Sequence, residues 1–346
     1  MILFNCDYNE GAHESILKRM WDTNYEQTLG YGEDIYCTQA SQIIKELCKD
    51  TSIDVHFMVG GTQTNLTVID AALRSHQGVL CADTGHINVH ETGAVEACGH
   101  KVLPLPSTDG KITAKQIEDA YLAHVNNEAF EHMVQPKMVY LSFPTELGTI
   151  YYKDELEAIS SVCRTHHLYL FIDGARLGYG LAATDNDISF ADLATLSDVF
   201  YIGGTKQGAL FGEAVVIRHP DLQQDFRYIM KQKGGMLAKG RLLGIQFLTL
   251  FEDNLYLKLS KHADELADKI RDTIRTAGYP FLVESHTNQV FPILPDTLLE
   301  ELGKKYQYSY ERRIDDSHSA VRFCTSWATR AEAVEQLIAD IRALSS

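Results

Sequence analysis

Two polar residues follow apolar runs of the kind that form buried parallel strands. Asp173 follows the run 168–172 and precedes Arg176, and Lys206 follows the run 198–202. Ligands of α/β proteins bind at the carboxyl ends of such strands. A lysine there can form an imine when burial or a cationic neighbour lowers its pKa, and a carboxylate can pair with a pyridinium nitrogen. The pair predicts a pyridoxal-phosphate site; the alternative is that Asp173 caps a turn and Lys206 is a solvated loop residue.

A glycine-rich segment after a third strand-like run suits a phosphate. Gly60, Gly61 and Thr62 follow the run 53–58 and open a helical pattern. Free backbone N–H groups at a helix start, together with a hydroxyl, favour an anion. The segment is neither a P-loop nor the glycine fingerprint of dinucleotide enzymes, so a dehydrogenase is not favoured.

A histidine and an arginine complete the candidate set. His86 follows the run 78–82 and carries a flat ring that could stack on a cofactor. His86 and His90 share a helix face, which leaves a metal site as an alternative, but the chain has no H-E-x-x-H pattern and no third ligand, so we expect no metal. Arg322 stands alone in the apolar run 320–325, where it either snorkels outward or is poised for a carboxylate.

Strand-like and helical patterns alternate through most of the chain, which predicts βαβ units and a mainly parallel sheet with helices on both faces. We therefore expect an α/β fold, with a large domain over 1–245 and a connecting helix plus a smaller α+β domain over 246–346. Capping-box spacing occurs at Thr113 with Gln116 and at Thr329 with Glu332. The expected elements are strands at 53–58, 78–82, 101–105, 137–142, 168–172, 198–202, 289–294 and 320–325, and helices at 65–76, 113–125, 153–166 and 238–277.

Composition excludes several classes of protein. The 346 residues include 31 Lys and Arg against 47 Asp and Glu, which gives a formal net charge of −16. A nucleic-acid partner is not expected, because phosphate neutralisation needs clustered Lys and Arg. No apolar run is long enough to suggest a membrane span, and the first residues lack a basic leader region, so we expect a cytoplasmic protein. The seven cysteines show no C-x-x-C spacing, which argues against a zinc ribbon or a disulfide framework.

Taken together, these motifs resemble the low-specificity L-threonine aldolases, which belong to the β-eliminating-lyase group with the aspartate-aminotransferase fold. The resemblance implies pyridoxal 5'-phosphate in Schiff-base linkage to Lys206, with Asp173 paired to its pyridinium nitrogen and His86 stacked on its ring. Further cofactor contacts are implied at Gly61, Thr62, Arg176 and Thr205, and substrate contacts at Arg176, Arg322 and Asp7. The motifs that carry the resemblance are 60–66, His86 with Glu91, 172–176, 205–206, 31–34 and 321–322.

The same resemblance implies a homodimer or homotetramer with shared active sites, to which residues 31–34 contribute across the interface. Three positions depart from the family pattern. An early Ser-Asp-Thr reads Cys6-Asp7-Tyr8 here, and Glu146 stands where the family offers a histidine near the substrate's β-hydroxyl. Leu237 replaces an arginine that approaches a phosphate across the interface; the residues that could supply this charge instead are Lys231, Lys233 and Lys239.

The implied reaction is retro-aldol cleavage of a β-hydroxy-L-amino acid, of the threonine or allo-threonine type, to glycine and an aldehyde. Arg176 and Arg322 would hold the carboxylate, and His86, Glu146 or a water between them would take the β-hydroxyl proton. β-Elimination and aminotransfer are alternatives at the same site, and a non-catalytic binding protein is an alternative of another class. Burial and like charges are expected to raise the pKa of Glu146. In the rival interpretation, Glu146 points to solvent from a loop.

Overall fold

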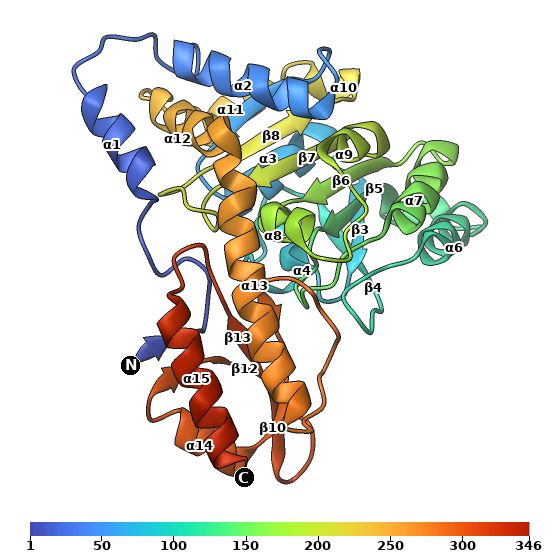
Figure 1. The fold of residues 1–346 in the computed structure, drawn as a ribbon. Helices are drawn as coiled ribbons and strands as arrows, with labels where there is room; N and C mark the ends of the chain where they lie inside the picture. The colour runs from blue at the N-terminus through green and yellow to red at the C-terminus, as the bar shows by residue number, and fades with distance from the viewer. Residues whose placement is uncertain (346) are drawn as a thin grey trace.

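A seven-stranded sheet and a smaller sheet region are joined by one long helix in the computed structural model, which describes residues 1–345 (Figure 1). The large sheet has the strand order β2-β8-β7-β6-β5-β3-β4. Strands β4, β3, β5, β6 and β7 are parallel, whereas β8 is antiparallel to both β2 and β7. The expected α/β class with a mainly parallel sheet is confirmed. The strands are β2 (Asp54–Met58), β3 (Gln77–Ala82), β4 (Lys101–Leu105), β5 (Gln135–Ser142), β6 (Tyr169–Asp173), β7 (Val199–Gly203) and β8 (Glu213–Ile217).

Strand β8 is missing from the predicted strands, while the other six agree with prediction to within two residues at each end. It follows β7 through a short glycine-containing loop with no helix between them. The chain therefore lacks the strand–helix–strand alternation that identified the other strands. This loop carries Lys206.

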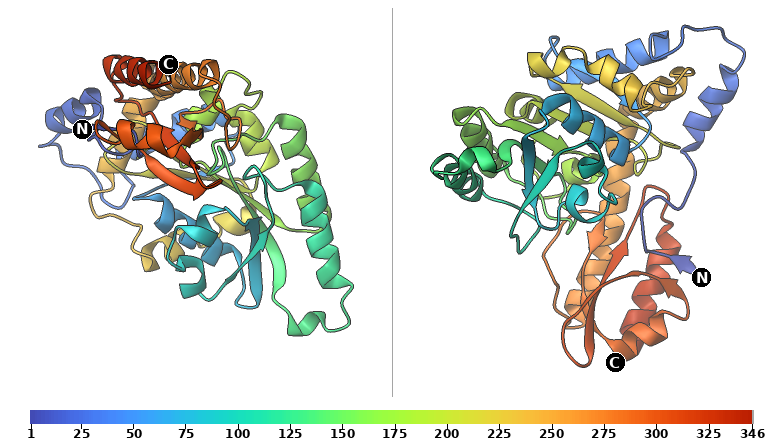
Figure 2. Two further views of the ribbon diagram at one scale, coloured as in Figure 1. Left: turned by 90° about the horizontal axis from the view of Figure 1, so that it is seen from below. Right: turned by 180° about the vertical axis from the view of Figure 1, so that it is seen from behind.

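Helices cover both faces of the large sheet because side chains alternate along each buried strand. On one face, Leu170 and Ile172 pack into a core with α2, α6, α7, α9 and α12. On the other, Phe171 and Tyr201 pack with α3, α10 and α11, which are seen from behind in Figure 2. The capping box at Thr113 and Gln116 is confirmed at the start of α6. The helices are α2 (Ile35–Cys48), α3 (Gly61–Ala72), α6 (Ala114–Val125), α7 (Lys153–Thr165), α9 (Phe190–Leu196), α10 (Pro220–Gln223), α11 (Phe226–Gln232) and α12 (Arg241–Phe251).

Helix α3 begins and ends four residues before the predicted helix 65–76. It ends because the backbone of Leu73 is extended. The predicted helix 238–277 is also wrong as a single element. Left-handed backbone at Asp253 and Asn254 separates α12 from α13 (Leu255–Thr276). The short helices are α1 (Glu14–Asp22), α4 (His86–Val89), α5 (Ala94–Ala97), α8 (Leu177–Ala182) and the 3-10 turns η1 (Phe130–His132) and η2 (Glu252–Asn254).

Helix α13 connects the two regions, since it packs on α8 of the large region and on α15 of the small one (Figure 1). The predicted capping box at Thr329 and Glu332 is wrong: Arg330 occupies the N-cap of α15, and the Thr329 hydroxyl accepts the N–H of Ser326 instead. The small region contains β9 (Gln289–Val290), β10 (Ile293–Pro295), α14 (Asp296–Leu302), β11 (Tyr306–Gln307), β12 (Ser309–Arg313), β13 (His318–Cys324) and α15 (Ala331–Leu344).

The first residues of the chain also lie in the small region, unlike the expected division at 245. Strand β1 (Ile2–Leu3) pairs in parallel with β11, and Phe4 is fully buried in the small core. The chain then crosses to the large region before α1. The proposed boundary at 245 itself falls inside α12, whose apolar face packs on α2.

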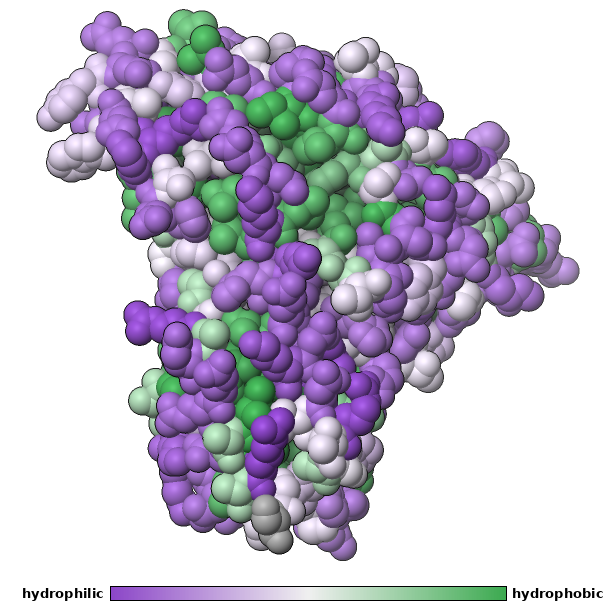
Figure 3. Space-filling view, in the orientation of Figure 1, coloured by the Kyte–Doolittle hydropathy of each residue, from purple (hydrophilic) through white to green (hydrophobic). Residues whose placement is uncertain are grey.

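The surface of the two regions differs in character. Hydrophobic residues gather between α2 and the upper part of α13, while the small region is mostly hydrophilic (Figure 3). Large side chains at the N-terminal end are also exposed: Trp21, Tyr25 and Leu29 have exposed fractions of 83%, 95% and 68%. Within residues 1–345, no helix combines the length and apolar character that crossing a membrane requires.

Candidate active site

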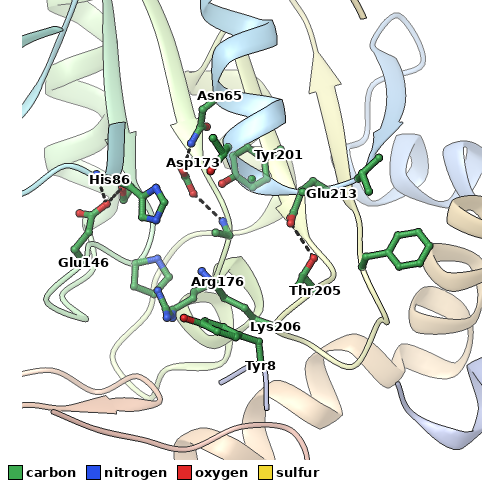
Figure 4. A pocket seen from close by; sticks show the side chains of 18 of the residues that line it. Tyr8, Asn65, His86, Glu146, Asp173, Arg176, Tyr201, Thr205, Lys206 and Glu213 are labelled. Carbon is green, nitrogen blue, oxygen red and sulfur yellow. Dashed lines mark hydrogen bonds between the residues drawn. The ribbon is translucent and has the colours of Figure 1, made fainter. Parts of the chain in front are cut away.

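A cavity of about 330 Å³ opens at the carboxyl ends of β5, β6 and β7 (Figure 4). It is bounded on one side by the start of α3 and on another by the loop that carries Lys206. The structure thus brings together most of the predicted site residues from distant parts of the chain. Those lining the cavity are Gly61, Thr62, His86, Glu146, Asp173, Arg176, Thr205 and Lys206.

Two glycines let the ends of β6 and β7 approach each other closely enough to form this site. A Cβ atom on Gly174 would lie 1.9 Å from the carbonyl oxygen of Tyr201, and one on Gly203 would lie 2.4 Å from that of Ala175. Any larger residue would push the two strand ends apart. The glycines beside Asp173 and before Lys206 therefore have a direct packing role.

Asp173 is a buried carboxylate held by several donors. Its Oδ2 atom accepts the Tyr140 hydroxyl at 2.5 Å and the Asn65 amide at 3.0 Å, and its Oδ1 accepts the Ala175 N–H at 2.9 Å. Burial alone would raise the pKa of Asp173, but the charge of His86 and these hydrogen bonds outweigh it and hold the pKa below its usual value. The group is an anion that can face a positively charged ring nitrogen.

Lys206 lies in the wall of the same cavity. Its amine has no hydrogen bond or ion pair within residues 1–345. Burial lowers the pKa of Lys206, and the Arg176 charge lowers it further. Its backbone is fixed because its carbonyl accepts the buried Tyr179 hydroxyl at 2.5 Å. A lysine of lowered pKa without a partner suits covalent attachment to a carbonyl compound.

The start of α3 forms a cradle for an anion. Its N-cap, Gly60, has no side chain to cap the helix, so the first N–H groups are left for a ligand. A Cβ on Gly61 would lie 3.3 Å from the Tyr201 hydroxyl, which leaves little room for a side chain there. The Thr205 hydroxyl faces the same cavity from the Lys206 loop. These groups fit a phosphate.

His86 belongs to a chain of hydrogen bonds that ends at Asp173. Its Nδ1 donates to Oε1 of Glu91 at 2.8 Å, and the same oxygen accepts the Asn65 amide at 2.7 Å. Burial works to lower the pKa of His86, but the Glu91 hydrogen bond and the Asp173 charge raise it. In the sequence, Asn65 and Glu91 stand out only as parts of the family motifs. Nothing in the residues around them predicts that Asn65 bridges two carboxylates.

Glu146 lies in the cavity wall and does not point to solvent. Its Oε1 accepts the backbone N–H of His86 at 2.8 Å and the Ser142 hydroxyl at 2.6 Å. Burial raises the pKa of Glu146, and the negative charge of Asp173 raises it further. The carboxyl group is therefore placed beside His86 with a pKa shifted toward neutrality.

Arg176 is fixed by Asp7, and this changes the role expected for Asp7. The guanidinium donates to both carboxylate oxygens at 2.7 and 3.0 Å, and Asn288 donates to one of them at 2.9 Å. Asp7 is fully buried and lies outside the cavity lining, so a direct substrate contact does not fit this arrangement. Burial tends to raise the pKa of Asp7, but the Arg176 charge lowers it to about 2. Asp7 positions the arginine.

Arg322 is not part of the cavity lining. Its guanidinium donates to the carbonyl of Asn5 at 3.1 Å and to the hydroxyl of Ser309 at 3.2 Å. A substrate contact by Arg322 remains a prediction. The arrangement does show that Arg322 is turned toward neighbouring groups of the small region and is not snorkelling into open solvent.

None of the three lysines considered for the Leu237 position lines this cavity. Lys231 lies over the ring of Tyr31 at 4.6 Å, and Lys233 pairs with Asp70 at 2.9 Å. Leu237 itself packs against the large core. Residues 1–345 also contain no group of three or more His, Cys, Asp or Glu side chains arranged to hold a metal ion.

An unpaired lysine, a buried carboxylate and an anion cradle in one cavity, at the edge of a mainly parallel sheet, are the groups that a pyridoxal-phosphate site requires. Sequence comparison agrees, because the profile of the beta-eliminating lyase family matches residues 10–297. The chain belongs to this family, whose members depend on pyridoxal phosphate. The resemblance seen in the motifs is confirmed.

Individual relatives narrow the comparison. A low-specificity L-threonine aldolase of Pseudomonas aeruginosa is 30% identical, with 98% of this chain and 96% of that protein covered. The structure of Leishmania major threonine aldolase is 43% identical, covers 100% of both chains and superposes with a TM-score of 0.97. A variant of Thermus thermophilus aspartate aminotransferase is 13% identical and superposes with a TM-score of 0.72. The match covers 99% of this chain and 91% of that protein, and it shows the shared fold alone.

Proposed function

We propose that the protein is a pyridoxal-phosphate-dependent aldehyde-lyase that cleaves the Cα–Cβ bond of a β-hydroxy-L-amino acid, of the threonine or allo-threonine type, to glycine and an aldehyde. The observation that carries the proposal is the unpaired Lys206 amine of lowered pKa in one cavity with the ionised Asp173. The threonine aldolases of Pseudomonas and Leishmania, similar over the full length, support this choice of reaction.

The residues present fit the cofactor. Lys206 would attach it, Asp173 would face its ring nitrogen and keep that nitrogen protonated, and the His86 ring would lie against its face. The start of α3 and Thr205 would hold its phosphate. When bound, pyridoxal phosphate supplies an electron-withdrawing ring that takes up the electron pair of the broken bond.

The remaining polar residues would orient the substrate and move its proton. Arg176, held by Asp7, would bind the substrate carboxylate, with Arg322 as a second candidate from the small region. Glu146 accepts the backbone N–H of His86, and either side chain would take the proton of the substrate's β-hydroxyl. Burial raises the pKa of the Glu146 carboxyl, which makes it a better proton acceptor than an exposed carboxylate.

Labelling and turnover test this function. Borohydride reduction followed by peptide mapping should place the pyridoxyl group on Lys206, and a panel of amino acids should show glycine and aldehyde release from β-hydroxy substrates. Label on another lysine would contradict the assignment. Release of ammonia and a keto acid would favour β-elimination, amino-group exchange with a keto acid would favour aminotransfer, and no turnover would favour a non-catalytic binding protein.

We further propose that the chain forms a symmetric dimer or tetramer with shared active sites. The support is the exposed set of large side chains on α1 and in the segment that follows it, Trp21, Tyr25 and Leu29, next to the motif 31–34. Exposed patches of this kind mark association surfaces. Sedimentation of the holoenzyme should give a dimer or larger species, and an active monomer at assay concentration would contradict the proposal.

A further inference from the structure

A second buried carboxyl group, Glu213, lies in the cavity wall and has no part in the reaction described above. It is the first residue of β8, with an exposed fraction of 3%. In the sheet it pairs with Gly203 of β7 and Met58 of β2. These two strands lead directly to Lys206 and to the anion cradle at Gly60. Glu213 therefore sits between the two segments that would surround the cofactor phosphate.

Its hydrogen bonds leave one oxygen without a partner. Oε1 accepts the Thr205 hydroxyl at 3.1 Å, and that hydroxyl in turn accepts the N–H of Gly212 at 3.0 Å. Oε2 is buried and has no hydrogen-bond partner within the described chain. No ion pair reaches Glu213 there either, since Lys206 contributes only a more distant positive charge. A buried, unpaired polar atom of this kind needs a ligand or a proton.

The surroundings favour the protonated acid. The groups that act on Glu213 are the Lys206 amine, which favours its charge, and the Asp173 carboxylate, which opposes it; the Tyr201 and Tyr256 phenols are neutral neighbours. Burial dominates and raises the pKa of Glu213 to about 8. At pH 7 the group is thus mainly a neutral carboxylic acid, which has an O–H to donate.

We propose that Glu213 is a neutral carboxylic acid in the phosphate cradle. Its O–H group donates a hydrogen bond to a phosphate oxygen of the bound cofactor. The inference rests on the proposed function for the identity of the ligand. The cradle would then combine N–H groups of α3 with one O–H donor from Glu213, whose other oxygen keeps the hydrogen bond from the Thr205 hydroxyl. An ionised carboxylate at this place would repel the phosphate, so only the neutral form fits the complex.

This arrangement links phosphate binding to a proton. The protein binds the phosphate only with Glu213 protonated, so affinity falls once the pH rises above the pKa of about 8 in the free protein. The loss approaches about tenfold for each further pH unit. Pyridoxal, which lacks the phosphate, does not share this loss. The ratio of the two affinities isolates the phosphate contribution, because titration of Lys206 affects both ligands alike.

The test measures dissociation constants of pyridoxal phosphate and pyridoxal for the apoprotein between pH 6.5 and 9.5, by absorbance and not by turnover. In the wild type, the preference for the phosphorylated ligand should fall above about pH 8. Glu213→Gln keeps a donor that does not titrate, so its preference should stay flat. Glu213→Ala should lose roughly ten- to hundred-fold in affinity for pyridoxal phosphate and little for pyridoxal.

Asp264 offers a matched control. It is a buried carboxyl group of α13 whose two oxygens also lack partners, and it does not line the cavity. Asp264→Asn should leave the ligand preference and its pH dependence as in the wild type. Thermal unfolding of each variant reports whether the fold is kept; if Glu213→Ala does not fold, the pH profile of Glu213→Gln still decides.

The two proposals fail in different ways. If the wild-type apoprotein binds no pyridoxal phosphate, or borohydride labels no Lys206, the proposed function is wrong. If the wild type binds and is labelled but its phosphate preference is the same at every pH, the role of Glu213 is wrong. That role is also wrong if Glu213→Gln repeats the wild-type profile, or if Glu213→Ala weakens both ligands equally.

Discussion

The two sides of the cavity hold buried carboxyl groups at strand ends, yet the two groups differ in charge. Asp173 accepts hydrogen bonds from Tyr140, Asn65 and Ala175, and its pKa is lowered. Glu213 accepts one hydrogen bond from Thr205, and its pKa is raised to about 8. Burial opposes the charge of both groups. At Asp173 the His86 charge and the hydrogen bonds outweigh burial, whereas at Glu213 the Lys206 charge and the Thr205 hydrogen bond do not. One wall thereby suits a cationic ring nitrogen, and the other offers a neutral hydrogen-bond donor that suits a phosphate oxygen.

Removing the charge of Asp173 should have the largest effect. In Asp173→Asn no anion would face the nitrogen of the cofactor ring, so that nitrogen would be less readily protonated and the ring would withdraw electrons less strongly. We expect kcat for β-hydroxy amino-acid cleavage to fall by roughly 10³-fold. The borohydride label should remain on Lys206. A rate within tenfold of the wild type would show that the ionised wall is not needed for catalysis.

The next effect concerns Glu146, the proposed proton acceptor beside the ionised wall. Glu146→Gln keeps the size of the side chain but cannot take a proton, so cleavage should slow by roughly 10²-fold or more. The visible band of the bound cofactor should persist, because Lys206 and Asp173 are untouched. An unchanged rate would remove Glu146 from the mechanism and leave His86 or a water as the base.

A smaller change should come from one donor of the ionised wall. Asn65→Leu removes the amide that joins Asp173 to Glu91, at 3.0 and 2.7 Å. With fewer donors, the pKa of Asp173 should rise, and the acid limb of the pH–rate profile should move to higher pH. We expect kcat near neutral pH to fall by about tenfold. A profile that superposes on the wild type would show that the remaining donors suffice.

The last expected effect is on stability and distinguishes the two walls directly. Glu213 has a raised pKa in the folded state, so it binds its proton when the unfolded chain has already lost it, and stability falls as the pH rises from about 4.5 to about 8. Glu213→Gln lacks this titration. The free energy of unfolding of its apoprotein should therefore rise relative to that of the wild type over that range, by at most about 1.4 kcal/mol for each pH unit.

Thermal unfolding at fixed protein concentration measures the difference as a midpoint that rises relative to the wild type by a few degrees near pH 8. Asp173→Asn is the contrasting variant. Because the pKa of Asp173 is lowered in the folded state, its charge stabilises the fold at pH values above its pKa in the unfolded chain, and this stability is lost as the pH falls. The unfolding midpoint of Asp173→Asn should therefore not rise above that of the wild type at high pH. A constant offset between Glu213→Gln and the wild type would contradict the raised pKa of Glu213.

Local patterns were sufficient for the parts of the site that lie at predictable strand ends. The runs before Asp173 and Lys206, and the glycines before Thr62, mark the carboxyl edge of a parallel sheet, and the structure brings these residues to one cavity. Such an edge follows from strand and helix periodicity, which each segment carries by itself. The capping box at Thr113 was equally local and is present.

Contacts between segments that are far apart in the sequence could not be predicted from local patterns. The pairing of Asp7 with Arg176, the bridge of Asn65 between Glu91 and Asp173, and the docking of β1 on β11 each depend on residues far apart in sequence. The kink at Asp253 and Asn254 also broke a helical pattern that looked continuous. No period or spacing encodes such contacts.

The sequence by itself determined the class of fold, six strands of the large sheet and the residue types at the sheet edge, because hydrophobic periodicity and strand-end chemistry are local properties of each segment. Only the tertiary structure decided which carboxyl group is ionised and which is neutral. That choice depends on which charges and hydrogen-bond donors the fold brings around each buried group. Strand β8 shows the reason: its antiparallel position between β2 and β7 places Glu213 in the cavity wall, and the pairing arises only when the whole sheet forms.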